Sequence, residues 1–405
     1  MKTSLMRMNS GQHNRRRILP SRSTDDFTRL QKQIWPLSLF LKFYGINIYQ
    51  TKFSIYGCFI IIILFSQLVY ALANTVIYGK LQGSYMFCFR FLQFVAPNII
   101  LNVSYHHLRR NRGNIVAILK SFQNEDRYPF IRLKLLFICF FLCFFGGLHI
   151  YAFKRVKSLI TPQGFFKFFI LNINITEWEI SDFWQNIIID FLFNADIWLL
   201  LIPRIVISLC YVTLCYLLGN SFEKFNEELK ENMQHSSTDV EVFYQRYLNI
   251  CKITQSVDGI YCRMVFLWFA FLVMELTYDF FNLVTSFGQE QQRPIYLQLI
   301  IIAILHLLKF FSISIPAGSI RTVSQSLIFE VCRKSHLEGV AGNLRKQRIY
   351  HNLAVCMHRN FACLTGWKAF NITGSLILTT LSLISSIIII LTQFQQTLHK
   401  LIKNV

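Results

Sequence analysis

The sequence contains little charge and few acidic side chains. Only 15% of its 405 residues are charged, 21 acidic residues stand against 41 basic ones, and 53% of the residues are hydrophobic. A water-soluble protein of this size needs a more charged surface than this composition can supply. We therefore expect the lipid bilayer to surround most of the chain.

Motifs of enzymes and of metal sites are also missing. The chain has no Walker A loop, dinucleotide-binding fingerprint, His-Glu-x-x-His motif or nucleophile elbow, so nothing in it indicates an enzyme, and we expect no cofactor. The cysteines and histidines between residues 332 and 363 follow no common zinc spacing, so we expect no metal site. Residues 1–32 are polar and hold no apolar stretch before a cleavage site, so membrane insertion should begin at the first transmembrane helix.

Long apolar segments are what the sequence does have. Seven of them approach the roughly 20 residues that a helix needs to cross the hydrocarbon core: 54–77, 84–104, 134–153, 187–218, 264–285, 295–317 and 372–394. The sequence thus predicts an all-α membrane protein. We expect a cytoplasmic segment (1–53), then a domain of seven transmembrane helices (54–394), and then a short extracellular tail (395–405).

The distribution of Lys and Arg sets the orientation of these helices. Of the 41 basic residues, 30 lie in residues 1–53 and in the loops 105–134, 219–263 and 318–371. Cytoplasmic loops retain basic residues during insertion, so the N-terminus should be cytoplasmic and, after seven crossings, the C-terminus extracellular. Most of the net charge of +20 is explained in this way, without a nucleic-acid partner.

This topology has consequences for the loops. None of the eleven cysteines falls in an external loop, so we expect no disulfide framework. Of three Asn-x-Ser/Thr sequons, only Asn174-Ile-Thr176 lies outside, which makes Asn174 the expected glycosylation site. Apolar residues recur at helical spacing in the segments 221–263 and 319–371, so both should extend the membrane helices into the cytoplasm.

The last apolar segment carries a polar stripe. Helical spacing places five polar residues on one face: Ser375, Thr379, Ser382, Ser386 and Gln393. The stripe indicates either a pore wall, with Ile390 as a hydrophobic constriction beside a ring of Gln393, or helix packing through small residues. One helix cannot enclose a pore, so the first interpretation also requires an oligomer.

Ionisable residues inside the spans are costly unless paired or hydrated. Several lie in the predicted outer halves near aromatic side chains, which is typical of a pocket for a small organic ligand. The candidate lining residues are Arg90, Tyr151, Asp196, Trp198, Tyr278 and Asp279. The alternative is a set of structural ion pairs, for instance Arg90 with Asp196 and Lys309 with Glu275, and the two interpretations are compatible if a pair lines the cavity.

The stripe also carries a family resemblance. Residues 386–394, Ser-Ile-Ile-Ile-Ile-Leu-Thr-Gln-Phe, resemble the C-terminal signature of insect gustatory receptors, which is Thr-Tyr, five mostly apolar residues, then Gln-Phe. Ser386 and Ile387 replace the Thr and Tyr of the signature. The segments 370–373 and 35–45 are similar to the start of the last helix and to the pre-helix segment of that family.

The resemblance implies a gustatory receptor, related to the insect olfactory receptors. Its members form ligand-gated cation channels in the plasma membrane of taste neurons, as homo- or hetero-tetramers that detect small-molecule tastants; bitter compounds are the default expectation. In the family the signature helix lines and gates the pore, and this role maps onto Ser386, Ile390 and Gln393, the face that the spacing also selects. Tastants would bind in an outward-facing cavity.

Two other functional classes remain as alternatives. A G-protein-coupled receptor also has seven helices, but it needs an extracellular N-terminus, which the Lys and Arg distribution opposes. A secondary transporter would also use intramembrane charges. Transporters often contain inverted repeats, and none is visible in this sequence.

Tag accessibility tests the orientation. We expect an N-terminal epitope tag to bind antibody only after the cells are permeabilised, and a C-terminal tag to bind on intact cells, because an odd number of crossings separates the two ends. Immunofluorescence of two singly tagged proteins measures this. Surface staining of the N-terminal tag together with a hidden C-terminal tag would instead support a G-protein-coupled receptor.

Overall fold

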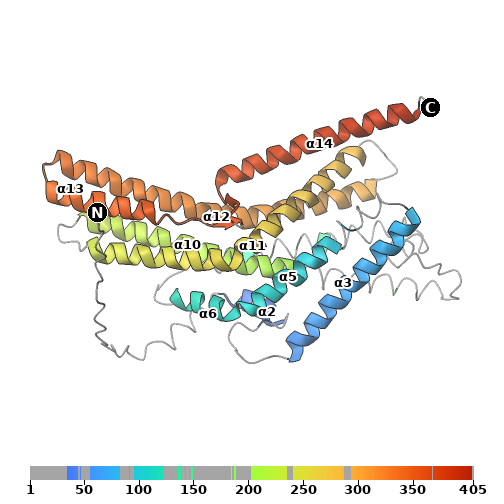
Figure 1. The fold of residues 1–405 in the computed structure, drawn as a ribbon, viewed down its shortest axis with the longest axis horizontal. Helices are drawn as coiled ribbons and strands as arrows, with labels where there is room; N and C mark the ends of the chain where they lie inside the picture. Colours follow the sequence, from blue (N-terminus) through green and yellow to red (C-terminus); the bar gives the residue numbers. More distant parts are fainter. Residues whose placement is uncertain are drawn as a thin grey trace, which may run out of the picture.

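The chain folds as an elongated bundle of helices (Figure 1). The computed structural model describes residues 34–43, 46, 55–82, 95–122, 202–234, 240–286, 293–366 and 368–403, with isolated positions between 91 and 187. The first half contributes α2 (Trp35–Phe43), α3 (Ile55–Gln82), α5 (Ala96–Arg110) and α6 (Arg112–Ser121). The second half contributes α10 (Ile202–Gln234), α11 (Val240–Ser286), α12 (Arg293–Val340), α13 (Leu344–Arg359), β1 (Thr365–Gly366), β2 (Phe370–Asn371) and α14 (Gly374–Lys403).

Four of the described helices are long and apolar enough to cross a membrane: Pro203–Glu231, Glu241–Val284, Leu299–Val340 and Gly374–Phe394. A shorter apolar helix covers Gly57–Ala73. The predicted all-α membrane fold is confirmed. Most of the predicted span 134–153 and large parts of 84–104 and 187–218 lie outside the described residues, so the number seven stays a prediction.

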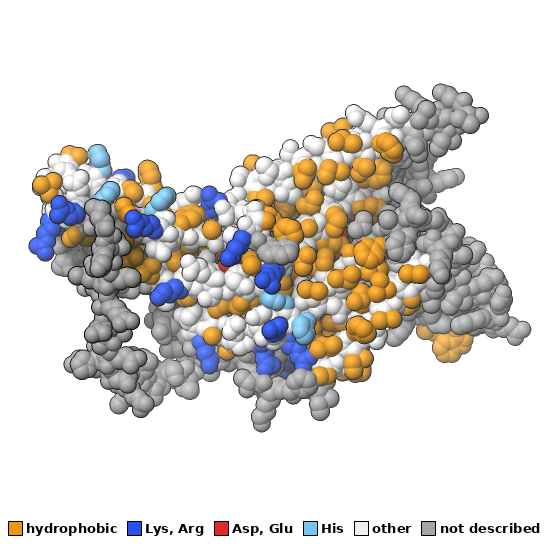
Figure 2. Space-filling model, viewed as in Figure 1, with side chains coloured by type: hydrophobic (Ala, Val, Ile, Leu, Met, Phe, Trp, Pro, Cys, Tyr) orange, Lys and Arg blue, Asp and Glu red, His pale blue; other side chains and the backbone are white. Residues whose placement is uncertain are grey.

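The longest helices reach well beyond the predicted spans. At 1.5 Å per residue, α11 with 47 residues and α12 with 48 are each about 70 Å long, against about 30 Å of hydrocarbon. Lys and Arg side chains gather on one end of the molecule and over the lower middle, and hydrophobic side chains spread over the other end (Figure 2). Of the predicted helical extensions 221–263 and 319–371, the ranges 221–234, 240–263, 319–340 and 344–359 are helical. Residues 235–239 lie outside the described residues, and a turn at 341–343 and the described residues of 360–371 are not helical.

Buried aromatic rings hold these extensions together. Phe222 and Phe225 of α10 and Tyr247 of α11 are fully buried, and the ring of Tyr247 lies 6.3 and 6.0 Å from the two phenylalanine rings. The Tyr247 hydroxyl lies 3.3 Å from Ser324 Oγ of α12. The packing thus joins α10, α11 and α12 in the part of the bundle outside the predicted bilayer.

A tight turn reverses the chain between α12 and α13. Gly342 adopts a positive φ of 76°, and the amides of Gly342 and Asn343 donate to the carbonyl oxygens of Gly339 and Glu338, as in a Schellman motif. The Asn343 side chain then accepts from the amide of Lys346 at the start of α13. Because both helix ends are satisfied within a few residues, α13 packs back along α12 (Figure 1).

A short hairpin replaces the helix that the sequence predicts over residues 360–373. Strands β1 and β2 pair antiparallel, with Thr365 opposite Asn371 and Gly366 opposite Phe370. A Cβ atom on Gly366 would lie 2.3 Å from the Phe370 ring, so only glycine fits beneath that ring. The prediction of a helix over this segment was wrong, because the ring packs directly on the backbone here.

Candidate functional site

Helix α14 is the most exposed of the candidate membrane helices. Only 11% of its most apolar stretch of 18 residues is buried. It packs against α11 and α12 and runs along the outside of the bundle to the C-terminus (Figure 1). Thr380 and Ile384 are its buried side chains, and Leu376, Ile377 and Ile388 pack against the same core.

The predicted polar stripe lies on the opposite side of this helix. All five of its residues are exposed. At 100° per residue, Ser375, Ser386 and Gln393 fall within about 20° of the direction opposite to Ile384. The stripe therefore faces away from the rest of its own chain.

Two hydroxyl groups of the stripe are satisfied within the helix. Thr379 Oγ1 donates to the Ser375 carbonyl oxygen at 3.0 Å, and Ser386 Oγ donates to that of Ser382 at 3.0 Å. Such groups tolerate lipid as well as water. Gln393 differs, because its exposed amide has no hydrogen bond among the described residues, and an unsatisfied amide is costly in hydrocarbon. This end of the stripe favours an aqueous or polar environment.

Large apolar side chains flank the stripe. Ile390, the predicted constriction, is 63% exposed, and Leu383, Ile389 and Phe394 are exposed on the same helix. An apolar surface of this extent needs lipid or another chain to cover it. Helix α14 therefore presents both apolar and polar surface outside its own subunit.

The hairpin before α14 is fastened to α11. The Asp258 carboxylate accepts from the backbone amide of Thr365 at 2.7 Å and lies 3.0 and 2.9 Å from the Thr365 hydroxyl oxygen. We call this pair of residues the hairpin latch. Next to it, the Phe370 ring packs on those of Phe266 and Phe269, at 6.2 and 5.6 Å. The start of the stripe helix is thereby fixed to α11.

A second contact fixes the same point to α12. A Cβ atom on Gly318 would lie 3.4 Å from the amide nitrogen of Gly374, the first residue of α14. The backbones of α12 and α14 are therefore so close that a methyl group on residue 318 would already touch α14. Both long helices thus hold the start of α14.

A cluster of ionisable side chains lies within the predicted spans. His306 Nδ1 of α12 is 2.6 Å from Asp279 Oδ2, and His306 Nε2 is 3.3 Å from Glu275 Oε2. Arg204 Nη1 of α10 donates to Glu275 Oε1 at 3.4 Å. The imidazole lies between two carboxylates, hydrogen-bonded to Asp279 and at ion-pair distance from Glu275. The cluster ties α10, α11 and α12 together by charge.

Glu275 therefore has Arg204 and His306 as its partners. The sequence offered Lys309 as an example, but Lys309 forms no ion pair within 4 Å in the part of the chain that the structure describes. In the sequence, Arg204 is only a basic residue inside the predicted span 187–218. Its partner could not be found from the sequence, because the relative rotation of α10 and α11 decides which carboxylate it meets.

A narrow cavity adjoins the cluster. It is lined by Arg204 and Lys309 and by Ser104, whose Oγ accepts from Trp268 Nε1 at 3.1 Å. Its volume is about 10 Å³, which is sufficient for a single water molecule. This cavity is too small for an organic ligand.

The predicted ligand pocket is only partly within the described residues. Asp279 is buried and bonded to His306, and Tyr278 beside it on α11 is half-buried. Arg90, Tyr151, Asp196 and Trp198 lie outside the described residues, as does Asn174, the predicted glycosylation site. Of the six predicted pocket residues, the structure therefore places two, which are neighbours on one helix.

Solved structures share this fold. No protein-family model matches the chain, and no curated protein matches it. The insect olfactory receptor OR5 from Machilis hrabei matches with a TM-score of 0.67 at 14% identity, over 91% of this chain and all of that one. The same receptor in complex with eugenol matches with a TM-score of 0.64 at 12% identity over the same shares. The chain therefore has the fold of an insect olfactory receptor.

The hairpin latch can be tested with Thr365. We expect Thr365→Val to speed hydrogen exchange of the amides in residues 362–373, because the side-chain hydrogen bond to a charged carboxylate, worth about 1.5–3 kcal/mol, is lost. Thr365→Ser keeps the hydroxyl and is the matched control. Mass spectrometry of the exchanged protein measures the difference. Equal exchange in the two variants would show that the latch does not hold the hairpin.

A double-mutant cycle tests the charge cluster. Arg204→Met leaves Glu275 without its strongest cation in a poorly solvated position, so we expect it to lower the free energy of unfolding by about 2 kcal/mol or more. Arg204→Met/Glu275→Met should cost less than the sum of the single changes. Arg333→Met, which breaks the exposed pair with Glu330, should cost under about 1 kcal/mol. Thermal unfolding in detergent measures all four variants, and strict additivity would argue against the pair.

Proposed function

We propose that the chain is a subunit of an insect chemoreceptor of the gustatory type, a ligand-gated cation channel whose pore is lined by α14. The single observation that carries the proposal is the direction of the polar stripe. It faces away from its own chain, which is where the axis of a symmetric oligomer would lie. The shared fold with an insect olfactory receptor supports the same assignment.

An oligomer gives the exposed surfaces of α14 their partners. A ring of copies, most simply a tetramer of identical or related subunits, would place the stripes of Ser386 and Gln393 around one central path. The Ile390 side chains would narrow that path. A sufficiently narrow hydrophobic ring excludes water and ions until it widens. The flanking leucine, isoleucine and phenylalanine side chains would pack between subunits or against lipid.

The ligand would be a small organic molecule from outside the cell. The related fold of OR5 has been solved with eugenol, and a cavity in the outer half of this chain, near Tyr278 and Asp279, would accept a tastant of comparable size. The residues Arg90, Tyr151, Asp196 and Trp198 belong to the same proposal. The resemblance of residues 386–394 to the gustatory signature favours taste over smell, and hence the plasma membrane of gustatory neurons.

The contacts of α14 suggest how binding would reach the pore. Asp279 and Glu275 bind His306, so a ligand in the outer half that displaces α11 relative to α12 changes this cluster. Both helices also hold the start of α14, through the hairpin latch and through Gly318. A relative movement of α11 and α12 would therefore tilt α14 and widen the Ile390 ring.

Adjacent serines provide a matched test of the pore. Ser385 and Ser386 are both exposed and both donate to the carbonyl four residues earlier, but only Ser386 lies on the stripe. In cells that express the receptor with its co-receptors, we expect a cationic thiol reagent to block ligand-evoked current through Ser386→Cys and not through Ser385→Cys. The unmodified chain, with its native cysteines, sets the baseline.

Substitutions at the constriction complete this experiment. Ile390→Ala should raise the current in the absence of ligand, because a smaller side chain no longer closes the path, and Gln393→Leu should lower conductance by removing a polar ring. Voltage-clamp recording measures both. If all of these variants conduct like the original chain in a responsive assembly, α14 does not line the pore.

A further inference from the structure

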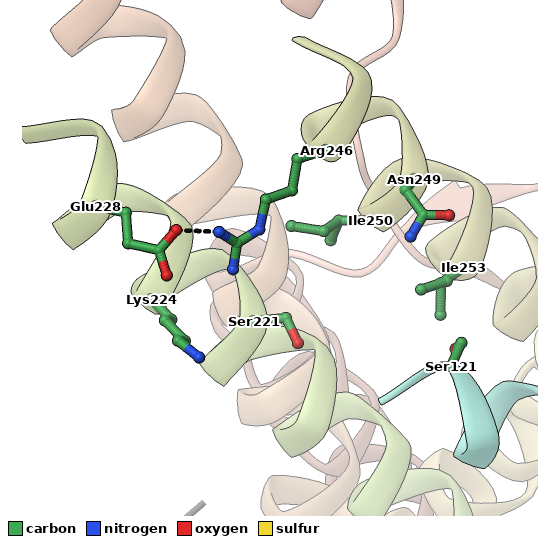
Figure 3. A pocket seen from close by; sticks show the side chains of 8 residues that line it. All are labelled: Ser121, Ser221, Lys224, Glu228, Arg246, Asn249, Ile250 and Ile253. Atoms are coloured by element: carbon green, nitrogen blue, oxygen red, sulfur yellow. Dashed lines mark hydrogen bonds and ion pairs between the residues drawn. The ribbon is translucent and has the colours of Figure 1, made fainter. Parts of the chain in front are cut away.

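A larger cavity lies at the basic end of the molecule, outside the predicted spans. Its volume is about 390 Å³, and it is enclosed by α10, α11 and the last turn of α6 (Figure 3). Cavities that bind small molecules usually measure about 300–1,000 Å³. This one is far from the α14 stripe in sequence and takes no part in the proposed pore.

Two cationic side chains and one amide line this cavity: Lys224 of α10, and Arg246 and Asn249 of α11. The hydroxyl groups of Ser121 and Ser221 also line it, but each donates to a carbonyl oxygen of its own helix. Lys224 forms no ion pair with any residue that the structure describes. A wall with two cations and a neutral donor is suited to an anion.

One carboxylate occupies part of this wall. Glu228 pairs with Arg246 across the cavity (Figure 3), and the two side chains are 29% and 36% exposed. A guanidinium has five N–H donors, so Arg246 can keep donors for a second acceptor. Glu228 therefore occupies one of the positions that an anionic ligand would take, and the two would compete for Arg246.

The remaining wall is apolar. Ile250 and Ile253 of α11 lie beside Asn249 along the same cavity. A bare phosphate or sulfate ion would gain nothing from them, whereas the carbon face of a ring would bury against them. The site thus combines an anion-binding side with a hydrophobic side.

We propose that this cavity binds a phosphorylated cyclitol or sugar, either free or as the headgroup of a lipid. A phosphomonoester carries close to two negative charges at neutral pH and three acceptor oxygens, which match Lys224, Arg246 and the Asn249 amide. The predicted span of α10 ends at residue 218, so Lys224 follows it by six residues, or about 9 Å of helix. A headgroup of the adjacent lipid leaflet lies at that depth. The proposal does not depend on the pore assignment.

Binding to the purified full-length chain tests the proposal. The probes are inositol trisphosphate added to the protein in detergent, and nanodiscs of phosphatidylcholine with or without phosphatidylinositol bisphosphate. We expect Lys224→Gln to weaken binding about tenfold, the loss of one charge-assisted contact. Lys230→Gln, the same charge change on an exposed position of α10 outside the cavity, should leave binding unchanged.

The carboxylate gives a prediction of opposite sign. Glu228→Gln removes the competitor for Arg246 and should tighten binding severalfold, whereas a cation site would lose affinity. Lys224→Arg should retain binding, which separates loss of the contact from loss of the fold. Binding to the soluble probe supports a free ligand, and binding only to the lipid probe supports a headgroup. Absence of binding to both probes, equal effects of Lys224→Gln and Lys230→Gln, or weaker binding by Glu228→Gln would overturn the proposal.

Discussion

Hydrocarbon offers no partner to backbone N–H and C=O groups, and the rest of this structure depends on that constraint. Apart from residues 372 and 373, at the start of the last predicted span, the described backbone within the predicted spans is helical, as it must be where water is absent. The same helices continue beyond the spans, because α11 and α12 are each more than twice as long as the hydrocarbon is thick. The hydrophobic core continues with them, because Phe222, Phe225 and Tyr247 belong to the same cluster of buried side chains as Leu276 and Phe310 within the spans.

The sequence predicted the features that periodicity and composition control. The apolar runs located α3 and the membrane parts of α11, α12 and α14, and the spacing of Ser375 to Gln393 placed the stripe on one face, which the structure finds exposed. These properties are local to one helix. They depend on residue type and on the helical rotation of 100° per residue, so neighbouring helices do not alter them.

Features that depend on pairs of helices could not be predicted. Nothing in the neighbourhood of Asp258 indicates that it would bind Thr365, more than 100 residues later. The partner of Glu275 depended on the rotation of α10, and the hairpin at 365–371 depended on a ring that packs over Gly366. For the ligand pocket, Tyr278 and Asp279 alone are within the described residues. The cavity around Lys224 also brings together three helices that the sequence treats separately.

Gly318 of α12 touches the first residue of α14, so a small movement of α12 would enter the long helix at that point. Helix α14 is 30 residues long, or about 45 Å. Ile390 lies 16 residues beyond Gly374, about 24 Å along the axis, so a tilt of about 5° at the start of the helix would displace it by about 2 Å. Because Ile384 and Ile388 also pack on the core, such a tilt would move the side chains that they touch. A small rotation at one end of the helix thus becomes, at the other, a displacement comparable with the radius of an ion.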